Sequence, residues 1–214
     1  MDENLANAFY GISFFLSLFV LVGLWRIAAK FPVTSRLWSL LALAWTLNLI
    51  ADLVWGILVF VAPDIWLDWI DYLYIGRYLL VFAAFWLYPQ PWGWRQWVAM
   101  FASMLIGWLL VWLLLARPAD NPDPSYALAG MIFPVMDVGI LFGAIYRWRM
   151  AEAAMQKTLL WLSVAMFAYG AANWFNYSVR VTKPEADSLL ALILWLLSTV
   201  FTGVAVWQFW KRTE

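Results

Sequence analysis

Long apolar runs follow one another along the whole chain, and short polar connectors separate them. A helix needs about 20 consecutive apolar residues to cross the hydrocarbon core of a bilayer. Backbone groups in lipid must hydrogen-bond internally, so runs of this length are expected to be helical. Prolines stand in the connectors, among them Pro32, Pro63 and Pro184. The pattern predicts an all-α polytopic membrane protein, a single domain over residues 1–214, with seven transmembrane helices at 7–30, 36–62, 65–88, 94–116, 126–148, 157–181 and 187–210.

Composition agrees with this interpretation, since 66% of the residues are hydrophobic and only 12% are charged. Soluble domains usually carry about 25% charged residues. Basic residues gather in the connectors on one side, and cytoplasmic loops are the ones enriched in Lys and Arg. This places the N-terminus outside and the C-terminus in the cytoplasm, as a multi-pass protein of a bacterial inner membrane. The basic residues that set this orientation are Arg26, Lys30, Arg36, Arg95, Arg147, Arg149, Lys157, Lys211 and Arg212.

The missing residue types restrict the chemistry of the chain, which contains no histidine and no cysteine. Thiol nucleophiles, Ser-His-Asp triads and Cys/His zinc sites are therefore excluded. The formal net charge is zero, so nothing suggests nucleic-acid binding. The 18 Trp residues cluster near the span ends, as in the aromatic belts that anchor proteins among membrane lipids. No metal site is predicted, and the sequence identifies no cofactor.

Several residues recur at a constant offset of 121 positions. Arg26 corresponds to Arg147, and Ala51-Asp52 corresponds to Ala172-Asn173. Pro63-Asp64 corresponds in the same way to the Pro-Glu pair at 184–185. The offset indicates two parallel three-helix units, 7–88 and 126–210, joined by the helix at 94–116. Chance matches at turns are the alternative. Parallel repeats occur in some transporters, which bind their substrate near the midplane.

Polar residues at membrane depth form the candidate site. Charges there cost roughly 2.5 to 3.5 kcal/mol on insertion scales, so Asp52, Arg77 and Asp137 should face the interior. Asn48 shares the face of Asp52, four residues away. The predicted ligand-binding residues are Asn48, Asp52, Tyr74, Arg77, Tyr78, Asp137, Tyr169, Asn173 and Asn176. Both acids are expected to approach Arg77. The cluster can be interhelical glue, a ligand pocket, or a proton relay or catalytic pair.

Scattered motifs carry a resemblance to a known class. They are ADLVW, a P-D turn, DYLYIGRYLL, FPVMD and PEAD. Over about residues 45–205 they resemble the multi-helix membrane sensor region ahead of bacterial diguanylate cyclases and phosphodiesterases. That resemblance implies a sensor-like bundle that passes its signal to a separate partner. The seven-helix 3+1+3 topology also resembles microbial rhodopsins, although the last span has no lysine for retinal.

The function expected from the sequence is that of a non-enzymatic integral membrane protein. It would bind a lipid-like or aromatic ligand in the polar pocket, as a sensor-like module or as an accessory subunit of a membrane complex. The expected partners are membrane lipids and a membrane protein. Two alternatives remain. One is an intramembrane lipid hydrolase, similar to the lysoplasmalogenase-like family, that uses Asp52 and Asp137. The other is a small transporter with a midplane site.

Overall fold

Seven α-helices make up the structure, a computed structural model that describes residues 3–31, 35–61, 69–86, 93–114, 124–182 and 189–213. The helices match the predicted spans closely. The prolines that separate the spans at 32, 63 and 184 lie outside the described residues. The helices are α1 (Glu3–Lys30), α2 (Ser35–Val61), α3 (Trp69–Trp86), α4 (Trp94–Leu114), α5 (Pro124–Met150), α6 (Ala153–Thr182) and α7 (Leu189–Thr213).

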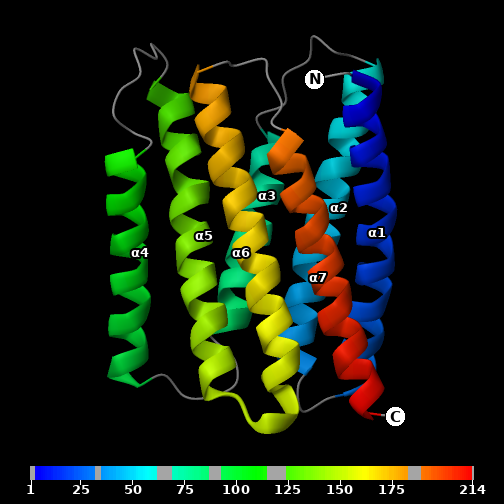
Figure 1. Ribbon diagram of the computed structural model, residues 1–214, viewed down its shortest axis with the longest axis vertical. Helices are drawn as coiled ribbons and strands as arrows, with labels where there is room; N and C mark the ends of the chain where they lie inside the picture. The colour runs from blue at the N-terminus through cyan, green and yellow to red at the C-terminus, as the bar shows by residue number, and fades with distance from the viewer. Residues whose placement is uncertain are drawn as a thin grey trace.

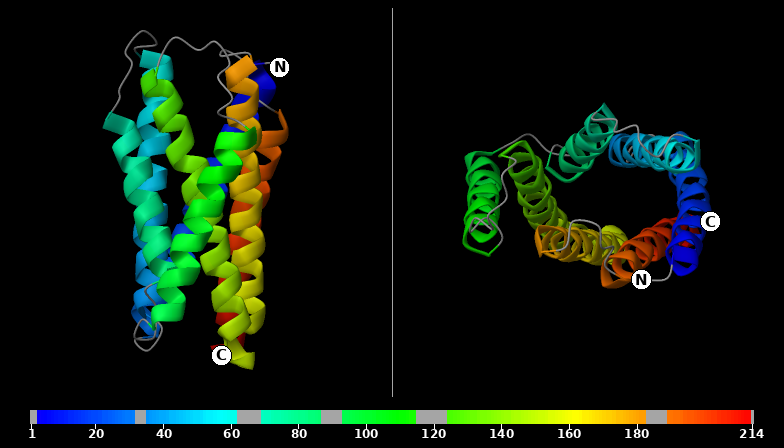
Figure 2. Two further views of the ribbon diagram at one scale, coloured as in Figure 1. Left: turned by 90° about the vertical axis from the view of Figure 1, so that its left-hand side faces the viewer. Right: turned by 90° about the horizontal axis from the view of Figure 1, so that it is seen from above.

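Six of these helices stand side by side in a closed ring, seen end-on in Figure 2. The contacts run from α1 to α2, α2 to α3, α3 to α5, α5 to α6, α6 to α7 and α7 back to α1. Helix α4 packs against α5 on the outside of the ring. The start of α1 and the end of α7 lie at opposite ends of the bundle (Figure 1).

The helix ends show how local sequence sets the boundaries. Gly93 precedes α4, and its carbonyl accepts the backbone N–H groups of Gln96 and Trp97. The Gln96 side chain returns to accept the Gly93 N–H at 3.0 Å. This reciprocal arrangement resembles a capping box, in which a side chain three residues into the helix satisfies an otherwise unpaired donor. Only Ala151 and Glu152 separate α5 from α6, a shorter connector than the sequence predicted.

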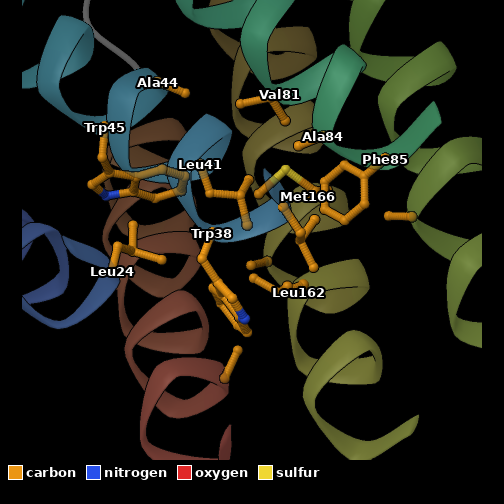
Figure 3. Close-up of a cluster of buried hydrophobic side chains, with 14 of the residues drawn as sticks. Leu24, Trp38, Leu41, Ala44, Trp45, Val81, Ala84, Phe85, Leu162 and Met166 are labelled. Atoms are coloured by element: carbon orange, nitrogen blue, oxygen red, sulfur yellow. The ribbon is translucent and has the colours of Figure 1, made fainter. Parts of the chain in front are cut away.

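A cluster of buried hydrophobic side chains packs between the helices of the ring (Figure 3). It joins residues from α1, α2, α3, α5, α6 and α7, of which α2 contributes the large side chains Trp38, Leu41 and Trp45. Large apolar side chains also cover the outside, as with Phe19 of α1 at 76% exposure and Phe101 of α4 at 62%. A chain that is apolar both inside and outside is expected in lipid.

Four of the described helical segments are long and apolar enough to cross a membrane: Ala8–Lys30, Arg36–Ile57, Ala153–Asn176 and Leu189–Arg212. Tyr72–Trp86 is a shorter apolar helix. The structure therefore supports a helical membrane protein. Seven spans, the outside-to-inside orientation and the repeat stay predictions.

The interface between α3 and α5 is held by a close approach and two sets of hydrogen bonds. A Cβ atom at Gly143 would lie 2.6 Å from Trp86 Nε1, so only glycine accommodates this indole. Trp86 Nε1 donates to the Gly139 carbonyl at 2.9 Å. Buried Arg147 donates from Nε to the Phe85 carbonyl at 2.6 Å and from Nη2 to the Trp86 carbonyl at 2.8 Å. Arg147 thereby satisfies carbonyls that the end of α3 leaves without a helical partner. Gly139 and Gly143, four residues apart on α5, therefore allow α3 to pack closely against α5.

Candidate functional site

Asp137 of α5 is the centre of a hydrogen-bond network that reaches four helices. Its Oδ1 accepts the Tyr78 hydroxyl of α3 at 3.0 Å, and its Oδ2 accepts the Asn173 amide of α6 at 2.9 Å. The same Asn173 amide nitrogen lies 2.5 Å from the Tyr78 oxygen. Trp195 of α7 donates from Nε1 to Asn173 Oδ1 at 2.9 Å. We call these four residues the Asp137 network. Its carboxylate is only 5% exposed, and both of its oxygens are satisfied within the protein.

A glycine on α6 makes room for this network. A Cβ atom at Gly170 would lie 3.2 Å from Asp137 Cβ, which is tighter than ordinary van der Waals contact. Small residues let transmembrane helices approach closely. Gly170 therefore allows α6 to bring Asn173 within hydrogen-bond distance of Asp137, one helical turn further along.

Asp52 forms a second, separate network between α2 and α3. Asn48 donates from Nδ2 to Asp52 Oδ2 at 2.6 Å, across one turn of α2. The Tyr74 hydroxyl of α3 donates to Asp52 Oδ1 at 2.8 Å. We call these three residues the Asp52 network. The predicted pairing of Asn48 with Asp52 follows from their spacing on one helical face.

Arg77 of α3 is the buried cation of the site and is 3% exposed. Its Cζ lies 3.8 Å from the centroid of the Tyr169 ring, 5.4 Å from that of Tyr78 and 5.7 Å from that of Trp45. Its Nε is buried and has no hydrogen-bond partner. Cation–π contacts contribute up to about 2 kcal/mol when the cation is desolvated, yet they leave the N–H group of Nε unsatisfied.

The expected approach of the acids to Arg77 takes a different form from the one predicted. Both aspartates attract Arg77 electrostatically. Among the residues that the structure describes, however, no ion pair is recorded between Arg77 and either carboxylate. The oxygens of Asp52 and Asp137 are bonded instead to neutral hydroxyl and amide donors. The shortest recorded contact of the Arg77 guanidinium is instead with an aromatic ring, that of Tyr169.

Eight of the nine predicted ligand-binding residues have recorded contacts within the two networks or around Arg77. Asn176 is the exception, because no contact between it and the other eight is recorded in the described part of the chain. Trp45 and Trp195 also contact the site but are not among the nine predicted residues. The sequence does contain a signal for Trp195, since it lies 121 positions after Tyr74.

The donor set limits what the site can do. No group of three or more His, Cys, Asp or Glu side chains that could hold a metal ion occurs among the described residues. The groups present are two carboxylates, a guanidinium, tyrosine hydroxyls, amides and indoles. Such groups can donate or accept hydrogen bonds and can stack against a planar molecule. The arrangement therefore suits recognition of a ligand by hydrogen bonding and aromatic contact.

Fold and site together define a helical membrane protein with a buried polar cluster. Comparison with known proteins adds a similarity to a subunit of tetrathionate reductase from Salmonella typhimurium strain LT2. The two are 25% identical over 133 residues, which cover 58% of this chain and 38% of the relative. The chain thus matches little more than a third of that protein's length. No family model matches the chain, and no solved structure matches it.

Proposed function

We propose that this chain is an integral membrane subunit of a reductase-type complex in the bacterial inner membrane and that it holds a lipid-like or aromatic ligand beside Arg77. The observation that carries the ligand site is the buried guanidinium of Arg77, whose Nε has no hydrogen-bond partner. A buried donor without a partner costs about 1 to 3 kcal/mol, and more when the group is charged. A ligand oxygen would remove this cost.

If the fold contains a repeat, the polar cluster of one unit can be compared with the corresponding positions of the other unit. The comparison helps to decide whether the cluster binds a ligand or only holds helices together. We infer that α1–α3 and α5–α7 are two related units. The contacts of the ring support this, since α1·α2, α2·α3 and α3·α5 correspond to α5·α6, α6·α7 and α7·α1. Burial recurs at 121 positions. Leu41 and Leu162, Ala51 and Ala172, and Ala84 and Ala205 are fully buried pairs.

Hydrogen bonds recur at the same offset. Tyr74 donates to Asp52, and the residues 121 positions later, Trp195 and Asn173, form the corresponding bond. In both cases an aromatic donor on the third helix of a unit reaches a polar side chain on the second helix. Chance agreement between unrelated helices would not be expected to reproduce a specific pair of partners.

The first helices of the two units favour an offset of 120. Gly23 of α1 and Gly143 of α5 are 120 positions apart. A Cβ atom at Gly23 would lie 2.6 Å from Val206 Cγ1 of α7, just as one at Gly143 would lie 2.6 Å from Trp86 Nε1 of α3. We infer one extra residue between the first and second helices of the second unit, in place of the constant offset of 121 that the sequence predicted.

The charges break this symmetry. Ser198 stands at the position that corresponds to Arg77, and Ser17 at the one that corresponds to Asp137. Both serines are buried, and the α7·α1 interface packs without any charge at these positions. Because the related interface needs no ion to form, holding helices together is a poor explanation for Arg77 and Asp137. This asymmetry supports a role in ligand binding.

The proposed role as a component of a complex rests on the similarity to the tetrathionate reductase protein. That protein is named as one component of a reductase. Without histidine or cysteine, this chain lacks the usual ligands of haem, iron–sulfur clusters and zinc. Electron-transfer centres of these kinds would therefore reside in a partner, and this chain would supply the membrane component.

The proposal is tested on protein extracted from its native membranes in a mild detergent. Native mass spectrometry should find a bound small molecule on wild-type protein and on Ser198→Ala, and should find it depleted on Arg77→Gln. Ser198→Ala is the matched control because it changes the corresponding position of the other unit. Equal occupancy in all three proteins, or none in wild type, would contradict the ligand site.

The role within a complex has a separate test. Native electrophoresis of the same extract should place the chain in a band that also contains oxidoreductase subunits, identified by peptide sequencing. Migration of the chain by itself or only with copies of itself would contradict this part of the proposal and leave the ligand result standing.

The other expected functions stay predictions. A lipid hydrolase that uses Asp52 and Asp137 needs both acids at one substrate, but the structure places them in separate hydrogen-bond networks. The transporter and the sensor-like module, including the resemblance to cyclase sensor regions, have no specific observation in their favour.

A further inference from the structure

We propose that the seam between α1 and α7 binds an anionic phospholipid, whose phosphate contacts Arg26, Lys30 and Lys211 and whose acyl chains lie along the outside of the two helices. The site lies on the outer surface of the ring and needs no ligand beside Arg77, so it goes beyond the proposed function. Three features support it: the charge at one end of the seam, the apolar side chains that lead away from this charge, and the way in which the related seam is covered.

Exposed basic side chains gather where α1 and α7 end. Arg26 and Lys30 are both exposed, and their spacing of four residues places them on one face of α1. Lys30 Nζ lies 4.6 Å from the centroid of the Trp210 ring of α7, and exposed Lys211 directly follows Trp210. The cation–π contact thus brings basic residues of both helices to one seam. We call Arg26, Lys30 and Lys211 the basic cluster.

Little negative charge is available to neutralise the basic cluster. The sequence has no Asp or Glu from 4 to 51 or from 189 to 213. Among the described residues, which do not include Glu214, no ion pair of the cluster is recorded. Arg147, near the end of α5 in the other unit, is by contrast buried and donates to two carbonyls of α3. A phosphate would supply the missing charge, since Arg and Lys bind phosphate through charge-assisted hydrogen bonds.

Exposed apolar side chains continue from the basic cluster toward the middle of the bundle. Phe19 precedes Arg26 by seven residues, about two turns along the same face of α1, and it is 76% exposed. On α7, Trp207 precedes Lys211 by four residues and Val200 precedes Trp207 by seven. Both are exposed. Charge at the end and apolar surface along the length match a phospholipid, whereas a free phosphate ion would use only the charge.

Close packing of the two helices determines which side chains border the seam. A Cβ atom at Gly23 of α1 would lie 2.6 Å from a valine side chain of α7, and one at Gly203 of α7 would lie 3.5 Å from a valine side chain of α1. Phe19 stands four residues before Gly23, and Trp207 stands four residues after Gly203. Each is therefore one turn from the contact on its own helix, and the two aromatic side chains flank one seam.

The related seam, between α3 and α5, is covered by protein. A Cβ atom at Gly139 of α5 would lie 2.5 Å from Met104 Sδ of α4 and 3.2 Å from Phe82 Cε2 of α3, so α4 reaches this seam. At the repeat offset of 120, Gly139 corresponds to Phe19. At the offset of 121, Phe82 corresponds to Gly203. Among the described helices, none takes the place of α4 outside α1 (Figure 2), and the basic cluster favours an anionic lipid there.

Binding is measured by native mass spectrometry of the full chain in detergent. The probes are dioleoyl phosphatidylglycerol and dioleoyl phosphatidylcholine, which share acyl chains and differ in headgroup charge. Each basic residue near an anionic lipid surface contributes roughly 5-fold in affinity. Wild type should therefore bind phosphatidylglycerol about 5- to 100-fold more tightly. This preference should fall by at least about 5-fold in the triple variant Arg26→Gln, Lys30→Gln, Lys211→Gln.

The matched control is the triple variant Arg95→Gln, Arg149→Gln, Lys157→Gln. It removes the same charge from three exposed residues on the same end of the bundle, and it should keep the wild-type preference. Inorganic phosphate should displace no more phosphatidylglycerol than potassium chloride at equal ionic strength. Greater displacement by phosphate would assign the cluster to a free ion. An equal loss of preference in both triple variants would reduce the effect to net charge, and either result would overturn the lipid site.

A second measurement uses wild-type protein only. Phosphatidylglycerol with a photoreactive group at mid-chain, diluted into phosphatidylcholine nanodiscs, should crosslink mainly to α1 and α7. The corresponding phosphatidylcholine probe should label the outer helix faces without this concentration. The same pattern from both probes, or protection of the seam by a co-purifying protein, would overturn the proposal. Arg77→Gln should leave the crosslinks unchanged, so this site and the ligand site beside Arg77 succeed or fail separately.

Discussion

Replacement of Gly143 by alanine should loosen the contact between α3 and α5. The new Cβ atom would lie 2.6 Å from Trp86 Nε1 and 2.9 Å from Cδ1 and Cε2 of the same ring. Trp86 cannot easily withdraw. It is 1% exposed, it donates to the Gly139 carbonyl at 2.9 Å, and it stacks on Tyr146 with ring centroids 6.0 Å apart.

The size of the effect follows from three contributions. Forcing one extra carbon into a packed interface costs about 1 to 3 kcal/mol. If the indole moves, its hydrogen bond to Gly139 is weakened, which costs about 0.5 to 1.5 kcal/mol. Alanine favours a helix over glycine by up to about 1 kcal/mol, and this offsets part of the loss. The net expectation for Gly143→Ala is a destabilisation of about 1 to 3 kcal/mol.

The assay is reversible unfolding of purified protein in mixed micelles, followed by circular dichroism. Gly56→Ala is the matched control, because a Cβ atom there meets nothing within 4 Å. The control should be neutral or more stable by up to about 1 kcal/mol. Trp86→Phe removes the Nε1 atom that Cβ would strike. It should therefore cost less in the Gly143→Ala background than in wild type. We call the close approach of the Trp86 ring to Gly143 the steric lock. Equal stability of the Gly143 and Gly56 variants would refute it.

Three further predictions concern the cap on α3, the repeat and the orientation. Arg147→Gln, which removes donors from two buried carbonyls, should lower stability by about 1 to 3 kcal/mol, while exposed Arg149→Gln should stay within about 0.5 kcal/mol in the same unfolding assay. Tyr74→Phe and Trp195→Phe each remove one of the repeated hydrogen bonds, and each should cost about 0.5 to 1.5 kcal/mol; a cost in only one of them would count against corresponding roles. A single cysteine at exposed Gly93, on a chain without native cysteine, should react with a membrane-impermeant maleimide only after cells are permeabilised, and labelling of intact cells would reverse the orientation.

The order and length of the helices could be predicted because lipid imposes one simple constraint. A span must be apolar for about 20 residues and must satisfy its own backbone bonds. The run at 36–62 became α2 at Ser35–Val61 for this reason. The place of α4 outside the ring could not be predicted in this way. Lipid-facing and protein-facing sides of its helix are both apolar, so hydrophobic periodicity carries little information about its neighbours.

The candidate site could be predicted in part for a related reason. Charged side chains in lipid are costly. The sequence alone therefore predicts that three of them face the protein interior, namely Asp52, Asp137 and Arg77. Their partners depend on the rotation of whole helices and on contacts such as that of Gly170 with Asp137, which spacing along one helix does not reveal. Both acids lie close enough to Arg77 to attract it electrostatically, but no direct ion pair with it is recorded among the described residues. The carboxylates of both acids accept hydrogen bonds from neutral side chains. Arg77 makes its shortest cation–π contact with the Tyr169 ring.

The steric lock and the candidate site belong to one interface, which gives the lock a consequence for function. Tyr78 and Trp86 are eight residues apart on α3, close to two helical turns, and both reach α5. Asp137 and Gly139 receive them on the other side. Because a helix moves nearly as a rigid rod over two turns, a shift of α3 at Trp86 also displaces Tyr78 and the adjacent Arg77. Gly143→Ala should thus weaken ligand binding beside Arg77 although Gly143 belongs to neither network, whereas Gly56→Ala should leave binding unchanged.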